Sequence, residues 1–207
     1  MSPIKVLGVS GSPRKGRNTG SLLQAALDAV QEAGAETELL SLAGLSILPC
    51  TRCNTCVREK RCSQDGDDDM PAVKRKPEEA DGVIFAAPSY FGGVPGVITN
   101  MMDRTRSLKM DGTRLKARVC SALSGLSHGG AEQVAEHLAR FGLMHGMVVV
   151  GDIGDPVSEG YFGIASLQGD EGWRRVTGDA LALKNARGVG RRVAEVASSL
   201  RGTTRAE

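Results

Sequence analysis

The chain alternates short apolar runs with longer amphipathic stretches along most of its length. Five apolar runs have the length of β-strands, and we predict strands at Ile4–Val9, Thr37–Leu42, Gly82–Ala87, Ala117–Leu123 and Met147–Gly151. The stretches between them repeat apolar residues at helical spacing. They predict helices over Asn18–Glu32, Gly96–Arg106, Glu132–Phe141 and Asp179–Leu200.

Strands that alternate with helices in this way are typical of a parallel sheet with helices on both faces. Five strands fit the flavodoxin-like order 2-1-3-4-5 better than a complete dinucleotide-binding fold. We therefore predict an α/β, flavodoxin-like three-layer sandwich that forms one domain over residues 1–207. Ligands bind such sheets beyond the carboxyl ends of the strands, so the loops after the first, third and fourth strands form the expected site.

Three local features disturb the regular alternation. Pro77 falls in the helical stretch 72–80, and a proline there should kink or end the helix. Gly188 and Gly190 weaken the prediction for the middle of the last helix. The glycine-rich segment 152–177 is too long for an ordinary connection and is expected to be a loop that acts as a lid or an interface arm.

Composition narrows the class of protein. The formal net charge is +2, and no stripe of lysine and arginine interleaves with aromatic residues, so nucleic-acid binding has no support. No apolar run approaches the roughly 18 residues of a membrane span, and no signal-like stretch precedes Ile4. We expect a cytoplasmic protein, in which clustered cysteines indicate a metal or catalysis rather than disulfides.

The loop after the first strand has the composition of a phosphate cradle. Its glycines, hydroxyl residues and amide stand just before a helix, where backbone N–H groups and the helix dipole favour an anion. The expected contacts are Ser10, Ser12, Arg14, Asn18 and Thr19. The motif is neither a nucleotide-triphosphate loop nor a dinucleotide fingerprint, because the required residues and spacings are missing. The alternative is an ordinary turn with helix-capping residues.

The loops after the third and fourth strands are candidates for a flavin seat. Aromatic residues beside glycines suit a flat ring whose edge must approach the backbone. The residues expected to contact it are Pro88, Ser89, Tyr90, Phe91, Gly92, Gly93, Ser124, Gly125, His128, Gly129 and Gly130. The alternatives are a core aromatic pair beside a turn and, for His128, a solvated loop histidine. No catalytic acid or base stands out.

The most specific feature is a run of four cysteines, Cys50, Cys53, Cys56 and Cys62, spaced C-x2-C-x2-C-x5-C. The first three have the spacing of ferredoxin-type cubane clusters, and four thiolates in one short loop can surround a single inorganic centre. Zinc is an alternative, although zinc sites more often present two separate pairs. Cysteines without a metal are the third possibility.

Charged residues surround these cysteines. The cations Arg52, Arg58, Lys60 and Arg61 can offset the negative charge of a cluster, or they form a solvated loop. The acidic residues that follow, Asp65 and Asp67–Asp69, are expected to cap a helix rather than bind metal. The fifth cysteine, Cys120, lies in an apolar strand and is predicted to be a buried structural thiol.

The phosphate loop Ser10–Asn18, the cysteine segment Pro49–Met70 and the strand with its loop Ala80–Tyr90 together resemble the iron–sulfur flavoproteins of the NAD(P)H-dependent FMN reductase superfamily. The resemblance covers about Ile4 to Asp152. It implies one FMN and one [4Fe-4S] cluster per chain, with the four clustered cysteines as ligands. It also implies a homodimer or homotetramer, in which the cluster of one chain can approach the flavin of another, and a redox partner such as ferredoxin.

The expected function is an FMN-dependent oxidoreductase or electron-transfer flavoprotein. FMN is the expected reactive centre, and the cluster beside it is expected to relay single electrons. One alternative is a dehydrogenase of a small aminodeoxychorismate-type substrate in secondary metabolism, an activity found in one branch of the resembling family. Two others are an iron-free NAD(P)H-dependent FMN or quinone reductase and a non-enzymatic redox sensor.

Overall fold

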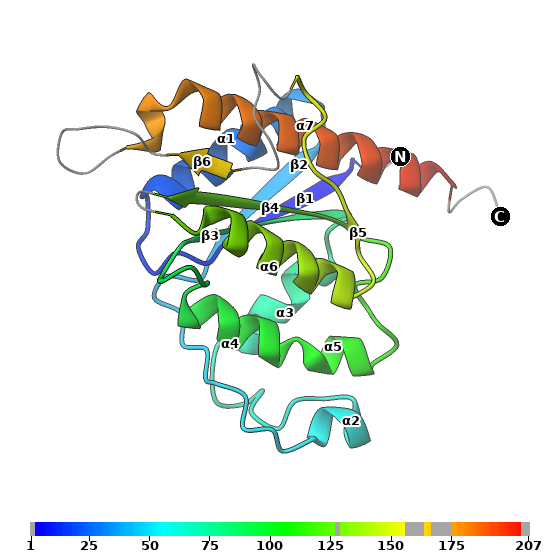
Figure 1. Ribbon diagram of the computed structural model, residues 1–207. Helices are drawn as coiled ribbons and strands as arrows, with labels where there is room; N and C mark the ends of the chain where they lie inside the picture. Colours follow the sequence, from blue (N-terminus) through cyan, green and yellow to red (C-terminus); the bar gives the residue numbers. More distant parts are fainter. Residues whose placement is uncertain (1–2, 127–128, 156–163, 167–174, 204–207) are drawn as a thin grey trace.

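A parallel sheet runs through the middle of the protein in the order β2-β1-β3-β4-β5 (Figure 1). The computed structural model describes residues 3–126, 129–155, 164–166 and 175–203. The strands are β1 (Lys5–Ser10), β2 (Glu36–Ser41), β3 (Gly82–Pro88), β4 (Val119–Leu126), β5 (Val148–Val149) and β6 (Ile164–Ser166). Every pair between them is parallel. The predicted flavodoxin-like order is confirmed.

Helices cover both faces of this sheet (Figure 1). One face carries α1 (Asn18–Glu32) and α7 (Ala180–Thr203), and the other carries α3 (Met70–Glu78), α4 (Gly96–Arg104) and α6 (Ala131–Met144). Side chains alternate between two cores along each strand, so that Val6 packs toward α1 and α7 while Leu7 packs toward the opposite helices. The two apolar cores explain why the central strands read as continuous apolar runs.

Glycines in α7 allow that helix to lie directly against its neighbours. A Cβ added at Gly190 would stand 2.1 Å from the backbone oxygen of Ala26 in α1. A Cβ added at Gly188 would stand 2.2 Å from the carboxylate of Asp152. The two residues that weaken the helical pattern are therefore required by close packing, and the predicted helix is present.

The structure differs from the prediction along the outer edge of β4. The fifth strand is shorter than expected, and it pairs only with the start of β4. β6 pairs with the end of β4, with Ile164 opposite Ser124. The segment expected to be a loop thus contributes a short strand, because β4 supplies the pairing that three isolated residues cannot. Residues 156–163 and 167–174 lie outside the described part, and η1 (Val176–Gly178) leads into α7.

Two further boundaries follow from local chemistry. Helix α3 ends one residue after Pro77, which lies in its last turn. The predicted helix 96–106 is divided into α4 and a separate short helix, α5 (Arg106–Met110). A short helix that was not predicted, α2 (Thr55–Glu59), lies within the cysteine segment and packs against α5. Among the described residues, no helix is both long and apolar enough to span a membrane.

Candidate functional site

Three polar loops meet at the carboxyl edge of the sheet. The backbone N–H of Gly11, just after β1, donates to the oxygen of Ala86 in β3 at 2.7 Å. Pro88 at the end of β3 lies opposite Gly125 in β4. A Cβ added at Gly130 would stand 2.5 Å from Ser89 Oγ. The structure therefore brings together the loops that the sequence singled out after strands one, three and four.

The loop after β1 is shaped by its own hydroxyl groups. Ser12 is buried, and its Oγ bonds both the N–H and the carbonyl of Arg14, which tightens the turn before α1. Asn18 and Thr19 begin α1, and Arg14 is exposed. Asn18 Oδ1 accepts a hydrogen bond from the N–H of Val176 at 3.1 Å, so this side chain also ties η1, the turn before α7, to the loop.

A tight turn presents the aromatic residues after β3. Tyr90 and Gly93 exchange two backbone hydrogen bonds, of 2.9 and 3.0 Å. Between them, Phe91 has a φ of 52° and Gly92 a φ of 78°. Phe91 is also fully exposed, so the alternative of a core aromatic pair does not apply to it. A non-glycine residue in the left-handed region costs on the order of 1 kcal/mol. Such strain at an exposed aromatic residue is typical of a functional site.

The end of β4 contributes the third polar segment at the carboxyl edge of the sheet. Ser124 is buried, and its hydroxyl donates to the oxygen of Ala87 at 2.9 Å, which joins β4 to β3. Only the lone pairs of Ser124 therefore remain for a ligand. Gly129 and Gly130 have positive φ and lead into α6, whereas His128 lies outside the described residues.

The four clustered cysteines line one pocket beneath α4 and α5. Cys50 and Cys53 are exposed, Cys56 and Cys62 are half-buried, and all four are free thiols. Three non-glycine residues of this segment, Arg52, Asn54 and Lys60, have φ between 55° and 61°. A loop that wraps its backbone around a common point needs such turns, and their strain again marks a functional segment.

Three of the four sulfurs have hydrogen-bond partners, and the first, Cys50 Sγ, accepts from the N–H of Arg52 at 3.4 Å. Cys53 Sγ lies 3.1 Å from Ser63 Oγ and 3.3 Å from Thr55 Oγ1. Hydrogen bonds with Ser63 and then Thr55 lower the pKa of Cys53 to about 6, so the thiolate needed for metal binding forms readily. Cys62 Sγ accepts a hydrogen bond of 3.1 Å from Arg104 Nε.

The four thiols that line the cysteine pocket are the type of donor set that an iron–sulfur cluster uses. Across residues 3–126, 129–155, 164–166 and 175–203, no three His, Cys, Asp or Glu side chains are close enough to share one metal ion. A cubane cluster places each thiolate on a different iron, so its ligands stand farther apart than around zinc. Four cysteines on one pocket, with hydrogen-bond donors to the sulfurs, suit that arrangement.

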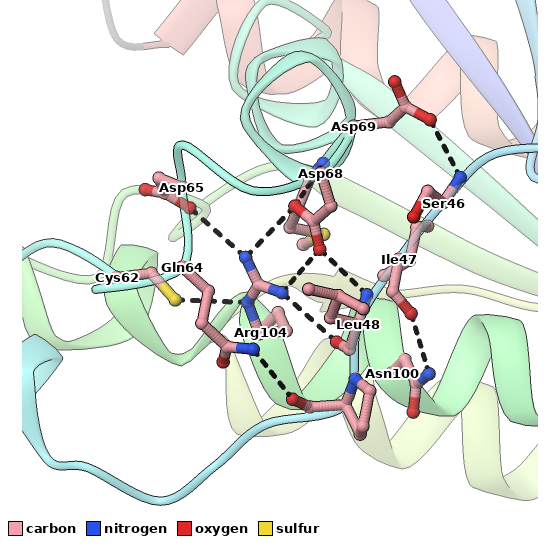
Figure 2. A network of polar contacts seen from close by, with 12 residues as sticks. Ser46, Ile47, Leu48, Cys62, Gln64, Asp65, Asp68, Asp69, Asn100 and Arg104 are labelled. Carbon is pink, nitrogen blue, oxygen red and sulfur yellow. Dashed lines mark hydrogen bonds and ion pairs between the residues drawn. The ribbon is translucent and has the colours of Figure 1, made fainter.

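A buried arginine anchors the cysteine segment to α4 (Figure 2). Arg104 is 2% exposed, and its Nη1 donates to Asp68 Oδ2 at 2.7 Å and to the oxygen of Leu48 at 3.2 Å. Burial disfavours the charge on Asp68, but hydrogen bonds from Arg104 and from two backbone N–H groups outweigh it and lower the pKa of Asp68. The pair is therefore ionised at neutral pH.

The acidic run joins the two ends of the cysteine segment rather than serving mainly as a helix cap. Asp68 accepts hydrogen bonds from the N–H of Leu48 and of Met70, and Asp69 accepts one from the N–H of Ser46 (Figure 2). Only the Met70 contact caps α3. The expectation of capping is therefore met in part; the other contacts form because residues 46–48 run beside residues 68–70 and need partners for their backbone N–H groups.

Of the predicted cations, Arg52 lines the cysteine pocket, together with Arg104 and Arg106, which were not predicted. Arg61 pairs with Glu59 on the surface, and Arg58 donates to the backbone oxygen of Cys53 rather than to a sulfur. Arg104 was not among the predicted site residues. The sequence does indicate that its side chain is buried, because Arg104 continues the three-residue spacing of the buried Ile98 and Met101 in α4.

Two titratable groups lie in the core, away from both sites. Cys120 is fully buried, and burial raises its pKa to about 12, which confirms the prediction of a structural thiol. His145 donates from Nε2 to Thr105 Oγ1 at 3.0 Å, since the threonine hydroxyl donates to Met102. Burial, assisted by the charge of Lys109, lowers the pKa of His145 to about 4.

Comparison with known proteins decides between the alternatives for the family. Residues 4–158 match the model of the NADPH-dependent FMN reductase family. An iron–sulfur flavoprotein from Archaeoglobus fulgidus is 37% identical over 198 residues, covering 95% of this chain and 96% of the relative. Another from Methanocaldococcus jannaschii is 40% identical, covering 93% of this chain and 97% of the relative. The chain belongs to the iron–sulfur flavoproteins of the NADPH-dependent FMN reductase family.

Solved structures agree with this family on the fold. RosB with a bound intermediate, 8-demethyl-8-formylriboflavin-5'-phosphate, matches with a TM-score of 0.73 at 18% identity, covering 97% of this chain and 81% of RosB. A flavodoxin, WrbA-like protein from Agrobacterium tumefaciens matches with a TM-score of 0.61 at 19% identity, covering 96% and 99%. Family and fold together support an FMN-binding flavoprotein oxidoreductase.

Proposed function

We propose that the protein is an electron-transfer oxidoreductase that holds FMN at the carboxyl edge of the sheet and a [4Fe-4S] cluster on Cys50, Cys53, Cys56 and Cys62. The observation that carries the proposal is the shared pocket of the four cysteines. These cysteines also have a sequence spacing that is typical of ligands to cubane clusters. The names of the two relatives, both iron–sulfur flavoproteins, add independent support.

The carboxyl edge offers what FMN requires. A phosphate fits the loop between β1 and α1, where backbone N–H groups, the hydroxyls of Ser10 and Thr19 and the cation Arg14 can surround it. The ring is proposed to lie against the turn at Tyr90–Gly93 and the glycines before α6, two segments that contact each other directly. The residues proposed to contact the ring are Pro88, Ser89, Tyr90, Phe91, Gly92, Gly93, Ser124, Gly125, His128, Gly129 and Gly130.

The two proposed sites lie at opposite ends of α4. The flavin loop leads into the N-terminus of this helix, and Arg104 at its C-terminus contacts Cys62. Nine residues of helix span roughly 13 Å at about 1.5 Å per residue. A cluster held by these cysteines would lie below the helix, whereas the sequence led us to expect a cluster directly beside the flavin of its own chain. We propose that a homodimer or homotetramer brings a cluster closer to the flavin of another chain.

When bound, FMN supplies one- and two-electron chemistry, and the cluster supplies single-electron transfer. The residues of this chain position the two groups and adjust their potentials. A carrier of single electrons, such as a ferredoxin, is the proposed partner. The proposed location is a reducing compartment such as the cytoplasm, where clustered cysteines serve as metal ligands more often than as disulfides.

Two other functions use the same residues. A dehydrogenase of an aminodeoxychorismate-type substrate would also place its reaction at the carboxyl edge. An iron-free NAD(P)H-dependent FMN or quinone reductase would need only that edge and would leave the cysteine pocket without a role. The pocket shared by all four cysteines favours the cluster-containing protein over the iron-free enzyme.

Flavin reduction in anaerobically purified protein tests the proposal. We expect reduced ferredoxin to bleach the flavin absorption rapidly and Cys53→Ser to slow this reaction at least 100-fold while FMN stays bound. Cys120→Ala is the matched control, since Cys120 lies in the core, and it should retain the wild-type rate. Rapid bleaching by NADPH at the same rate in wild type and Cys53→Ser would instead support the iron-free reductase.

A further inference from the structure

The contact between Arg104 and Cys62 stands out because a charged side chain is buried against a single sulfur. Arg104 comes from α4, 42 residues beyond Cys62, and its Nε lies 3.1 Å from Cys62 Sγ. Removing the arginine charge from water costs free energy, so other interactions must offset this cost for the side chain to be buried. The carboxylate of Asp68, also fully buried, supplies the compensating charge.

The remaining bonds of Arg104 fix the direction of its Nε–H. Nη1 and Nη2 form a two-pronged contact with the carboxylate of Asp68, at 2.7 and 3.3 Å. Nη1 also donates to the oxygen of Leu48, and Nη2 lies 3.6 Å from Asp65 Oδ1. Since the guanidinium is planar and rigid, these contacts leave Nε aimed at the sulfur (Figure 2). A lysine has one nitrogen and cannot maintain both contacts.

We propose that Arg104 is a positioning residue for the cluster: its Nε–H holds Cys62 Sγ at the pocket and withdraws electron density from that sulfur. The inference rests on the proposed function, because it takes Cys62 as a cluster ligand. A hydrogen bond to a ligating sulfur stabilises the more negative, reduced state of a cluster and raises its reduction potential. Arg104 therefore makes the cluster easier to reduce than its four thiolates alone would allow.

Three variants separate the hydrogen bond from the charge. Arg104→Lys keeps the positive charge and loses the contact to Cys62. The double variant Arg104→Met/Asp68→Asn removes both charges of the buried pair, so the local net charge is unchanged while the donor to sulfur is lost. Arg61→Gln is the matched control: it removes a charge next to Cys62 in the sequence, but its side chain is 65% exposed and makes no contact with sulfur among the described residues.

The decisive measurement is the midpoint potential of the cluster, followed by electron paramagnetic resonance in an anaerobic redox titration, with iron and FMN counted in the same samples. We expect Arg104→Lys and the double variant each to lower the equilibrium constant for one-electron reduction about tenfold, which is about 59 mV. Arg61→Gln should shift it much less. Loss of iron from both Arg104 variants with FMN retained would also support the positioning of Cys62.

The outcomes distinguish this inference from the proposed function. Wild-type protein without iron would end the proposed function, and the role of Arg104 with it. Wild-type protein with its full iron content, and equal potentials in all variants, would overturn the role of Arg104 alone. An equal shift in Arg61→Gln would also overturn it, because general charge rather than the hydrogen bond would then set the potential. If Arg104→Lys does not fold, the double variant still decides.

Discussion

The carboxyl edge of the sheet and the cysteine segment hold their proposed cofactors in different ways. At the carboxyl edge, backbone groups and glycines provide most of the proposed contacts to FMN, and strand pairing in the sheet fixes their positions. In the cysteine segment, regular structure is limited to the five residues of α2. Its shape depends on side chains, above all on the buried pair of Arg104 and Asp68.

The two sites should therefore be sensitive to different kinds of substitution. The carboxyl edge should tolerate changes of side chain but not an added Cβ where the backbone comes close. The cysteine segment should tolerate changes at its exposed cations but not the loss of either buried charge, because the remaining charge would be left without a partner.

Asp68→Asn should have the largest effect on stability. It leaves Arg104 buried without a full counter-charge, and we expect a loss of about 3–5 kcal/mol in the free energy of unfolding. Urea denaturation followed by circular dichroism measures this loss. The matched control is the neighbouring Asp69→Asn, whose exposed carboxylate makes one hydrogen bond to the Ser46 N–H and should cost about 1 kcal/mol. Equal losses in both variants would contradict the special role of the buried pair.

The pH dependence of stability tests whether the buried His145 is neutral in the folded protein. Because the folded pKa of His145 is about 4 and the unfolded value is about 6.5, the unfolded chain binds more protons between these values. The free energy of unfolding should therefore rise by up to about 3 kcal/mol from pH 4 to 6.5. Comparing urea denaturation at pH 5 and 7.5, we expect His145→Gln to reduce the difference. The same substitution at the exposed His137 should leave it unchanged, and a full pH effect in His145→Gln would contradict the assignment.

Gly130→Ala should weaken FMN binding about tenfold, or about 1.4 kcal/mol. The new Cβ would stand 2.5 Å from Ser89 Oγ and 2.8 Å from Gly92 Cα, so the loops after β3 and β4 must separate. Fluorescence titration of FMN into apoprotein measures the affinity. Gly96→Ala is the control, since a Cβ there meets nothing within 4 Å, and its affinity should match wild type. Unchanged affinity in Gly130→Ala would mean that the loop contact does not form part of the FMN site.

Phe91→Gly should have the smallest effect, with opposite signs on stability and binding. Glycine relieves the positive φ, so the apoprotein should gain about 1 kcal/mol in the free energy of unfolding. The loss of the exposed ring should weaken FMN binding at the same time. Thermal unfolding and FMN titration measure the two quantities. Phe91→Leu keeps the strain and serves as the control. A gain in stability without any loss of FMN affinity would indicate that Phe91 does not contact the flavin.

Much of the fold and part of the sites could be predicted from the sequence. The order of the central strands followed from the alternation of apolar runs and helices, and the loops at the carboxyl edge followed from that order. The cysteine spacing identified the second candidate site. These features are local in sequence or follow from general rules of parallel sheets.

What escaped prediction depends on contacts between distant residues. Arg104 pairs with Asp68 and reaches Cys62 across the fold, and no local pattern specifies that meeting. Strand β6 exists because β4 offers its outer edge, not because Ile164–Ser166 have a distinctive composition. In the sequence, the glycines of α7 indicate only a weaker helix. The close packing of Gly190 against Ala26, which explains a glycine there, depends on the folded structure.

The decisive measurement for the proposed pair of cofactors is the content of iron, sulfide and FMN per chain in anaerobically purified wild-type protein. We expect about one FMN with about four irons and four sulfides on each chain. Yellow protein with a full complement of flavin but no iron, obtained from strictly anaerobic cells, would contradict it.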